Sequence, residues 1–164
     1  MNKYRQMANK KREELVPFRR ELHRFPEPSL KEFETTNRIC RELDKAGIAY
    51  KRMEPTGVCG EIKGTKGESD HIVLIRSDMD ALEILEQTGL EFKSENVGVM
   101  HACGHDNHMT TVLGAVKLLH EHPEEFAGTI RFIFQPAEEV AAGAKLMIEQ
   151  GVMQGVDRAV GMHI

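Results

Sequence analysis

The fold is decided by the stretch His71-Ile72-Val73-Leu74-Ile75-Arg76-Ser77 and by the two acidic residues that follow it, Asp78 and Asp80. The unbroken apolar run Ile72-Val73-Leu74-Ile75 predicts a short strand that is covered on both of its faces. Strands of this kind occur in α/β proteins, in which helices lie on either side of a sheet. The stretch therefore indicates an α/β fold with acidic side chains where the strand ends.

The residues after this strand alternate between helical and extended patterns. We expect a helix at about 105–120, a strand at 129–134, a helix at about 141–150 and a strand at about 158–164. Alternation of this kind predicts right-handed β-α-β crossovers and a largely parallel sheet flanked by helices. The last strand is predicted to be buried, and the sequence stops inside it, whereas domain ends normally lie at the surface.

The residues before the strand predict helices and two further strands. Leu15, Phe18 and Leu22 recur at helical spacing, and the first 46 residues are expected to be helical, with a break at two prolines. Short strands are expected at about 48–53 and 57–63. The glycine-rich, charged segment 64–70 is typical of a connection between strands and not of a domain linker.

Composition excludes several classes of protein. A chain of 164 residues that is 40% hydrophobic and 29% charged is ordinary for a globular protein. Its net charge of −4 gives no electrostatic reason to expect nucleic-acid binding. We find no apolar run that approaches the ~18 residues of a membrane span, and no signal peptide. Because its three cysteines suggest neither a disulfide framework nor a zinc ribbon, we expect a cytoplasmic protein that contacts no membrane.

Chemically active residue types are concentrated at residues 100–109, Met-His-Ala-Cys-Gly-His-Asp-Asn-His-Met. On a helix that begins at His105, this histidine shares the inward-facing stripe with Met109. Cys103 lies just before that helix, where the helix dipole is expected to lower the pKa of the thiol and favour the metal-binding thiolate. We interpret the following other histidines and cysteines as structural: His23, His71, Cys40 and Cys59.

Further polar residues follow the predicted strands at their carboxyl ends: Asp78 and Asp80, then Glu138 and Glu139, then His163. The carboxyl ends of parallel strands meet at one edge, where open α/β sheets bind ligands. A thiolate, two imidazoles and a carboxylate suit Zn²⁺ or a neighbouring transition metal better than Ca²⁺ or Mg²⁺. One of the two adjacent glutamates can then hold a metal while the other acts as general base. The alternative is a pair that only complements the next helix dipole.

Motifs of several other catalytic classes are missing from the sequence, including the P-loop, the G-x-S-x-G turn and H-E-x-x-H. Two other functions stay open. The chain can be a metal-binding or interaction module that catalyses no reaction. It can also use Cys103 in thiol redox chemistry, although no resolving cysteine lies nearby in sequence.

Five segments resemble, in the same order, the motifs of the M20 metallopeptidase family: Arg20-Glu21-Leu22-His23, residues 77–82, residues 100–109, residues 134–139 and Gly161-Met162-His163. Within that family they are similar to the amidohydrolase branch of aminoacylases, hippurate hydrolases and auxin-conjugate hydrolases. The resemblance implies the catalytic domain of a metal-dependent exopeptidase. It also implies hydrolysis of the amide bond of an N-acyl amino acid or a small peptide-like substrate.

The resemblance also implies a role for individual residues. It predicts two divalent transition-metal ions, Zn, Mn, Co or Ni, with these ligands: Cys103 as the bridge and His105, Glu139 and His163 as terminal ligands. Glu138 is expected to be the general base and acid that acts with a metal-activated water. Asp80 is expected to orient a ligand imidazole.

The sequence departs from the resembled family in its length. Family members are more than twice as long, with a lid or dimerisation domain inserted after the strand of His163, followed by the rest of the catalytic domain. We therefore expect residues 1–164 to be the N-terminal half of a catalytic domain whose last ligand histidine is absent, with its metals incompletely bound. The longer protein is also expected to be able to form a homo-oligomer.

Overall fold

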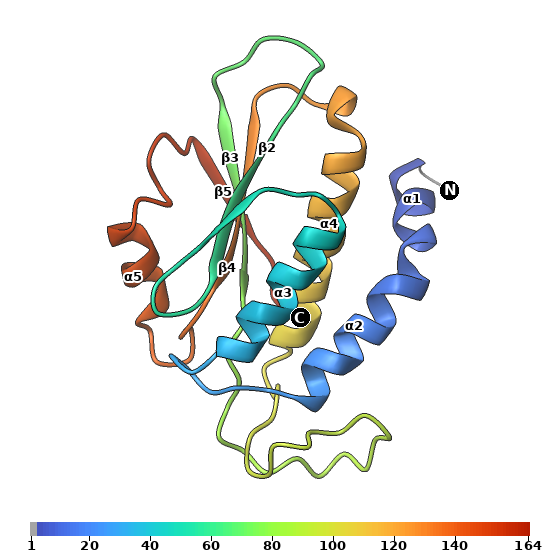
Figure 1. Cartoon of the computed structure of the whole chain (residues 1–164), viewed down its shortest axis with the longest axis vertical. Helices are drawn as coiled ribbons and strands as arrows, with labels where there is room; N and C mark the ends of the chain where they lie inside the picture. Colours follow the sequence, from blue (N-terminus) through green and yellow to red (C-terminus); the bar gives the residue numbers. More distant parts are fainter. Residues whose placement is uncertain (1–2) are drawn as a thin grey trace.

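The described part of the chain, residues 3–164 of the computed structural model, folds into one sheet with helices on both faces. The helices are α1 (Lys3–Lys10), α2 (Arg12–Arg24), α3 (Phe33–Lys45), α4 (His105–Glu121), the 3-10 helix η1 (Pro123–Glu125) and α5 (Gly143–Glu149). The strands are β1 (Tyr50–Arg52), β2 (Val58–Lys63), β3 (Ile72–Asp78), β4 (Thr129–Gln135) and β5 (Arg158–Gly161). Figure 1 shows α2, α3 and α4 on one side of the sheet and α5 on the other.

The sheet is mixed, with the strand order β1-β2-β4-β3-β5. Strand β3 is parallel to both β4 and β5, whereas β2 is antiparallel to β4 and to β1. The predicted α/β class is therefore confirmed, with the parallel pairs confined to the strands that helical crossovers connect. The short connection between β1 and β2 allows the antiparallel pairing that a hairpin requires.

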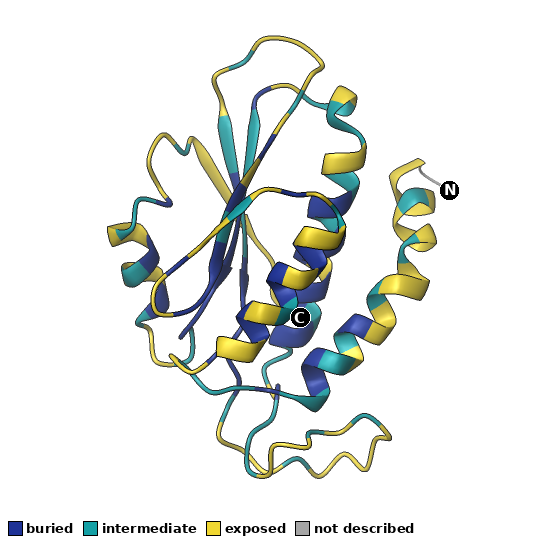
Figure 2. Cartoon of the chain, in the orientation of Figure 1, coloured by how far each residue is buried: buried dark blue, intermediate teal, exposed yellow. Residues whose placement is uncertain are grey.

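Two hydrophobic cores lie between the sheet and its helices, one on each face of the sheet. The larger one lies under α2, α3 and α4, and Figure 2 shows buried residues, in dark blue, on each of these helices. The smaller one lies under α5 and contains Leu74, Ile133 and Met147. Since successive residues of a strand point to opposite faces, β4 supplies Phe132 and Phe134 to the first core and Ile133 to the second.

Two predictions from the sequence differ from the structure. The final strand was expected to be buried, but all residues of β5 are exposed, because β5 is an edge strand that pairs with β3 alone. The predicted N-terminal helix is divided into α1 and α2 at Lys11, and Pro17 lies inside α2. Residues 1 and 2 of that predicted helix lie outside the described part of the chain.

A long connection, residues 79–104, joins β3 to α4 without a helix or strand of its own. Its two ends are held together by a β-bridge between Leu82 and Met100. The backbone N–H of Glu95 donates to the carbonyl of Arg24 at 2.8 Å, which fixes the connection to the end of α2. This anchoring matters because the connection carries Cys103.

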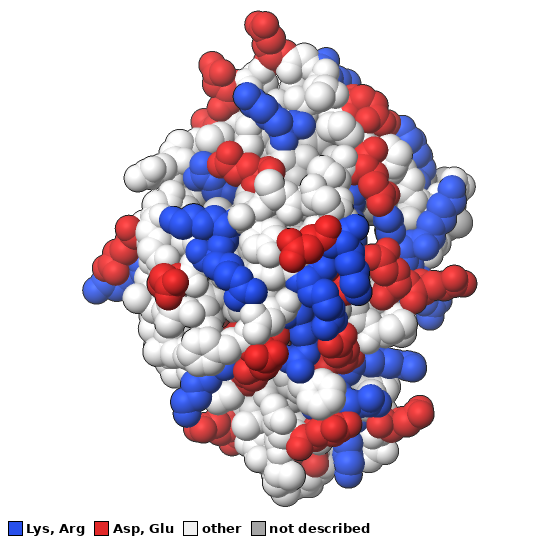
Figure 3. All heavy atoms as spheres, in the orientation of Figure 1, with Lys and Arg blue, Asp and Glu red and all other residues white. Residues whose placement is uncertain are grey.

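The surface agrees with the modest net charge of the chain. On the face drawn in Figure 3, basic and acidic side chains are interspersed and neither kind forms a large continuous patch. Within residues 3–164, no helix combines the length and the apolar character that crossing a membrane requires.

Candidate metal centre

The carboxyl ends of β3 and β4 meet at one edge of the sheet, as the sequence predicted. The parallel register sets Asp78, the last residue of β3, beside Gln135, the last residue of β4. The N-terminus of α4 and the residues after β5 reach the same edge, since Cys103 Sγ lies 3.3 Å from His163 Nε2. Segments that are far apart in sequence therefore contribute side chains to a single cluster.

His105 is the most deeply buried member of this cluster, with 0% of its surface exposed. Its Nδ1 lies 2.9 Å from the backbone carbonyl oxygen of Asp80, which can only accept a hydrogen bond. Nδ1 therefore carries a proton, so in the neutral form of the ring the unprotonated nitrogen is Nε2, which faces the cluster. Burial acts to lower the pKa of His105, but the Asp80 hydrogen bond and neighbouring carboxylates outweigh it and raise this pKa.

The buried polar atoms without a hydrogen-bond partner among the described residues include two that face each other in the cluster, His105 Nε2 and Glu139 Oε1. These atoms lie 3.6 Å apart, and Glu138 Oε2 lies 3.8 Å from the same ring nitrogen. Buried polar atoms are normally paired, and an unpaired one requires an explanation such as an ion. A divalent cation between the imidazole and the carboxylates would satisfy both atoms, so the residues present fit a metal.

The ligand atoms around His105 form three overlapping groups, of which two contain the expected ligands and the third contains Asp78 and His108. Those of Cys103, His105 and His163 all lie within 4.8 Å of one another, and so do those of His105, Glu138 and Glu139. His105 belongs to all three groups. The structure thus brings together every residue that was expected to bind metal, although their individual roles stay predictions.

The pKa of Cys103 differs from the expectation. The thiol lies at the start of α4, but burial and the nearby carboxylates, with Glu139 foremost, raise its pKa to about 11 in the protein without metal. The expected lowering by the helix dipole is wrong here because the acidic groups of the cluster outweigh it. A bound cation reverses this balance, since a coordinating thiol is deprotonated outright.

Glu138 and Glu139 lie on a tight turn, residues 135–143, which we call the glutamate turn. Its backbone takes the left-handed conformation at two alanines, Ala137 (φ 50) and Ala141 (φ 54). Gly143 closes the turn by donating its N–H to the carbonyl of Ala137 at 3.0 Å. A Cβ on Gly143 would lie 1.5 Å from the carbonyl oxygen of Pro136, so only glycine fits there.

Asp80 connects this turn to the buried histidine. One carboxylate oxygen, Oδ2, accepts hydrogen bonds from the backbone N–H of Glu139 at 3.0 Å and from the Ser29 hydroxyl at 2.6 Å. The other, Oδ1, lies 3.4 Å from His105 Nδ1, so His105 is the imidazole within reach of Asp80. Burial acts to raise the pKa of Asp80, but these hydrogen bonds lower it to about 2.

From the sequence, we placed Asp78 at this edge but assigned no role to it or to its neighbour His108. Nδ1 of His108 lies 2.5 Å from Asp78 Oδ1, and both side chains are buried. Asp78 also accepts a hydrogen bond from Arg76 at 2.8 Å and lies 3.7 Å from His105 Nε2. The spacing could have indicated His108, because it lies three residues after His105 and therefore on the same side of the helix.

His23, which we interpreted as structural, lies in a separate buried cluster between α2 and α4. Its Nδ1 is 2.7 Å from Asp106 Oδ2, and its Nε2 is 3.1 Å from Glu86 Oε1. Arg19 Nε lies 2.7 Å from the same oxygen of Asp106. Both nitrogens of His23 are therefore engaged by carboxylates.

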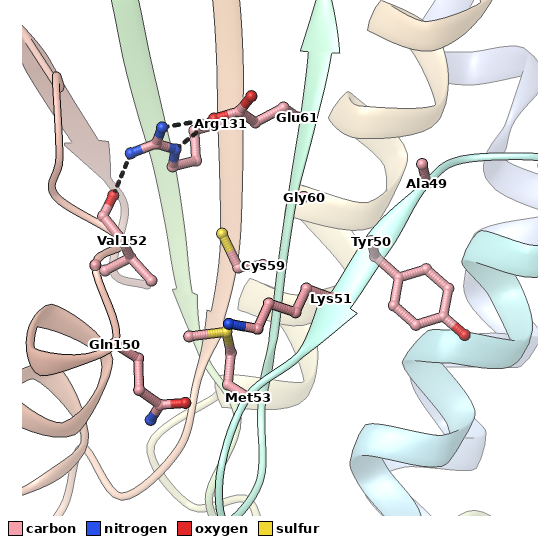
Figure 4. Close-up of a pocket in the computed structure, with 11 residues that line it drawn as sticks. Ala49, Tyr50, Lys51, Met53, Cys59, Gly60, Glu61, Arg131, Gln150 and Val152 are labelled. Carbon is pink, nitrogen blue, oxygen red and sulfur yellow. Dashed lines mark hydrogen bonds and ion pairs between the residues drawn. The ribbon is translucent and has the colours of Figure 1, made fainter.

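The other two cysteines lie away from the cluster. Cys40 is buried on α3, and burial raises the pKa of its thiol. Cys59, on β2, faces a hollow lined by β1, β2 and the end of α5 (Figure 4). Arg131 forms part of this hollow, where it is paired with Glu61. No histidine lines the hollow, so it lacks the mixed ligand set of the cluster at the sheet edge.

Comparisons with known proteins agree with this geometry. Residues 74–164 match the model of peptidase family M20/M25/M40. The chain is 48% identical over 151 residues to a Bacillus subtilis (strain 168) N-acetylcysteine deacetylase, covering 91% of this chain and 39% of that protein. It is also 48% identical over 151 residues to the IAA-amino acid hydrolase ILR1-like 5 of Arabidopsis thaliana, covering 92% of this chain and 34% of that protein.

A solved structure shares the fold over nearly the whole chain. It is that of the Bacillus subtilis YXEP protein, described as a dinuclear metal binding peptidase from the M20 family. The TM-score is 0.88 with 45% sequence identity, covering 97% of this chain and 44% of that chain. The chain therefore spans less than half the length of each of these three relatives.

Proposed function

Because the chain belongs to peptidase family M20/M25/M40, we propose that it is part of a metal-dependent hydrolase that cleaves the amide bond of N-acyl amino acids. The observation that carries this proposal is the pair of buried, unpartnered atoms, His105 Nε2 and Glu139 Oε1, that face each other at the sheet edge. The names of the two curated relatives specify derivatives of amino acids as substrates, which favours the same class here.

Cys103, His105, Glu139 and His163 are the residues that would hold the divalent ions. The two overlapping groups of ligand atoms that contain them share His105 and support a site for more than one ion. The mixture of thiolate, imidazole and carboxylate favours Zn²⁺, Mn²⁺, Co²⁺ or Ni²⁺ over Ca²⁺ and Mg²⁺. When bound, such ions polarise the amide carbonyl and lower the pKa of water toward ~7.

Glu138 is the proposed general base and acid. Its side chain is 40% exposed, whereas that of Glu139 is 18% exposed, so Glu138 is the more open of the two carboxylates to solvent and substrate. It accepts the proton of the attacking water and delivers it to the nitrogen of the departing amine. Asp80 fixes the ring of His105 and the backbone of Glu139, which keeps the two glutamates in their different directions.

A pair of matched substitutions tests this division of roles. Changing Glu138 to Gln should leave the Co²⁺ or Zn²⁺ content of the chain nearly intact. The same change at Glu139 should weaken metal binding first. In a form of the protein extended to the length of its relatives, Glu138→Gln should lower kcat on N-acyl amino acids by at least the ~10²-fold typical of losing a general base.

Two results would count against the proposal. If the Glu138 variant kept its turnover, or if it alone lost metal, the two roles would be assigned wrongly. If the extended protein bound metal but hydrolysed no N-acyl amino acid or small peptide, the alternative of a non-catalytic metal-binding module would be favoured. Elemental analysis after dialysis and release of free amine are the two measurements.

A further inference from the structure

Glu32 is a fully buried carboxylate that lies outside the cluster of metal ligands. It is 0% exposed, and no described Lys, Arg or His is paired with it. Its Oε1 accepts a hydrogen bond from the backbone N–H of Ala137 at 2.9 Å, and its Oε2 accepts one from the Thr56 hydroxyl at 2.7 Å. Burial raises the pKa of Glu32. A buried carboxylate without a cation is costly, so its position requires a reason.

The partner of Glu32 is the residue that directs the two glutamates. Ala137 immediately precedes Glu138 and takes a left-handed backbone conformation, which is disfavoured for a residue with a Cβ. Ala137 is itself fully buried, so its N–H has no access to water and depends on a protein acceptor. Glu32 is that acceptor.

A second buried carboxylate holds the same turn on the other side of Glu138. Asp80 Oδ2 accepts the N–H of Glu139, two residues beyond the bond made by Glu32. The backbone that carries Glu138 and Glu139 is thus fixed by two acceptors that come from different elements. Glu32 lies at the N-terminus of α3, and Asp80 lies just after β3.

We propose that Glu32 is a positioning residue that sets the direction of Glu138 and Glu139 by holding the N–H of Ala137. This inference rests on the proposed function, in which those glutamates serve as general base and metal ligand. Glu32 touches neither the ligand atoms nor the space between them, so it acts only through the backbone of the glutamate turn.

Amide hydrogen exchange of the metal-free chain tests the inference directly. Changing Glu32 to Leu removes the acceptor and keeps the volume, and it should speed exchange at Ala137 and Glu139 at least 10-fold relative to the amides of central strand β4. Glu32→Gln keeps an acceptor oxygen for Ala137 and a donor for Thr56, and it should restore the slow exchange. If the leucine variant does not fold, Glu32→Asp can replace it. Its side chain is one methylene shorter, which moves the acceptor away from the N–H of Ala137, so exchange in the turn should again be faster.

Thr56→Val is the matched control. It removes the other hydrogen bond of Glu32 and leaves the bond to Ala137, so exchange in the glutamate turn should stay within about 3-fold of the parent. The inference is overturned if Glu32→Leu accelerates all amides equally, which a purely structural role would do. It is also overturned if exchange at Ala137 is unchanged, or if Thr56→Val loosens the turn as much as Glu32→Leu.

Titration with Co²⁺, followed by its visible absorption, connects the turn to the metal site. Glu32→Leu should weaken Co²⁺ binding about 10-fold and change the absorption bands, whereas Glu32→Gln should restore both. If Glu32→Leu bound Co²⁺ as the parent does, Glu32 would not position Glu139, and the inference would fail. If the parent bound no Co²⁺, the proposed function would fail, and hydrogen exchange would still decide whether Glu32 holds the turn.

Discussion

Two buried histidines of this chain, His23 and His105, lie beside aspartates in clusters that differ in one respect. Both nitrogens of His23 have a carboxylate partner, Asp106 at 2.7 Å and Glu86 at 3.1 Å. His105 has a partner for Nδ1 only, and its Nε2 is buried with none among the described residues. Both ring nitrogens of His23 are therefore engaged by protein groups, whereas one ring nitrogen of His105 is left for a further group.

For these two histidines, the difference in hydrogen bonding separates the structural residue from the candidate ligand better than residue type or burial does. Both side chains are nearly inaccessible, with exposed fractions of 5% for His23 and 1% for His105. Both also have a raised pKa. Only the unpaired nitrogen, which faces Glu139 Oε1, marks one of them as a binding position.

The largest expected effect is the loss of metal from the cluster of His105. The double change Cys103→Ala and His105→Ala removes the proposed bridge and one imidazole, so bound Zn²⁺ or Co²⁺ should fall below detection after dialysis. The control removes the same residue types elsewhere, through Cys59→Ala and His71→Ala, and should keep its metal. Equal metal content in the two double variants would contradict the comparison.

Removal of the imidazole of His23 should instead cost stability. His23→Leu leaves Glu86 and Asp106 buried without that ring, although Arg19 still pairs with Asp106. We expect the free energy of unfolding to fall by about 3 kcal/mol, the lower end for breaking a buried pair. Urea unfolding measures this change. His122→Leu, at an exposed histidine, should cause almost none, and a similar loss in both variants would show that burial of the His23 pair is unimportant.

A smaller effect on metal binding is expected from a change at Asp80, which accepts hydrogen bonds beside the metal ligands. Asp80→Asn keeps the shape of the side chain but replaces one oxygen by an NH₂ group, which cannot accept from Glu139 N–H or face the Nδ1 proton of His105. Metal affinity should fall about 10–100-fold, as is usual for residues that orient a ligand. Isothermal titration with Zn²⁺ provides the measurement, and an unchanged affinity would remove Asp80 from the site.

The smallest effect is a pH dependence of stability that comes from His23. The hydrogen bond to Asp106 is the main cause of its raised pKa, with Glu86 adding to it, while burial and Arg19 oppose it. Protonated His23 therefore stabilises the fold fully below the unfolded pKa of about 6.5. This stabilisation is lost as pH rises through the folded pKa, with a slope of at most about 1.4 kcal/mol per pH unit.

This contribution is isolated by comparing the parent with His23→Gln across pH 6 to 9. The stability advantage of the parent should shrink as pH rises. An advantage that grew with pH would show that the neutral ring is the preferred partner of the two carboxylates.

The sequence was sufficient for the parts of the molecule that depend on local pattern and strand order. The apolar run in β3 and the inward stripe of α4 predicted the α/β class and the burial of His105. The rule that ligands gather at the carboxyl ends of parallel strands predicted that Cys103, Glu139 and His163 meet there. Because these features follow from spacing along the chain, no knowledge of distant contacts was needed.

The sequence was insufficient wherever a distant partner determines the outcome. Glu32 and Ala137 are 105 residues apart, and nothing in either segment indicates their hydrogen bond. The pKa of Cys103 rises because the thiol is buried and because carboxylates from the segment after β4 approach it, and together these effects outweigh the local effect of the helix. Likewise, β5 has the apolar pattern of a buried strand and lies exposed because its neighbours leave it at the edge.

The parallel arrangement of β3 and β4 also has a consequence for the order of folding. These strands pair residue 72 with residue 129 and can meet only after the intervening segment has closed a long loop. Pairings of such high sequence separation form slowly, because the entropy of loop closure is lost before the contacts compensate for it. The carboxyl edge therefore assembles late, after the local helices and the β1–β2 hairpin. We expect Co²⁺ to bind only in the last kinetic phase of refolding, which makes its absorption a reporter of the completed fold.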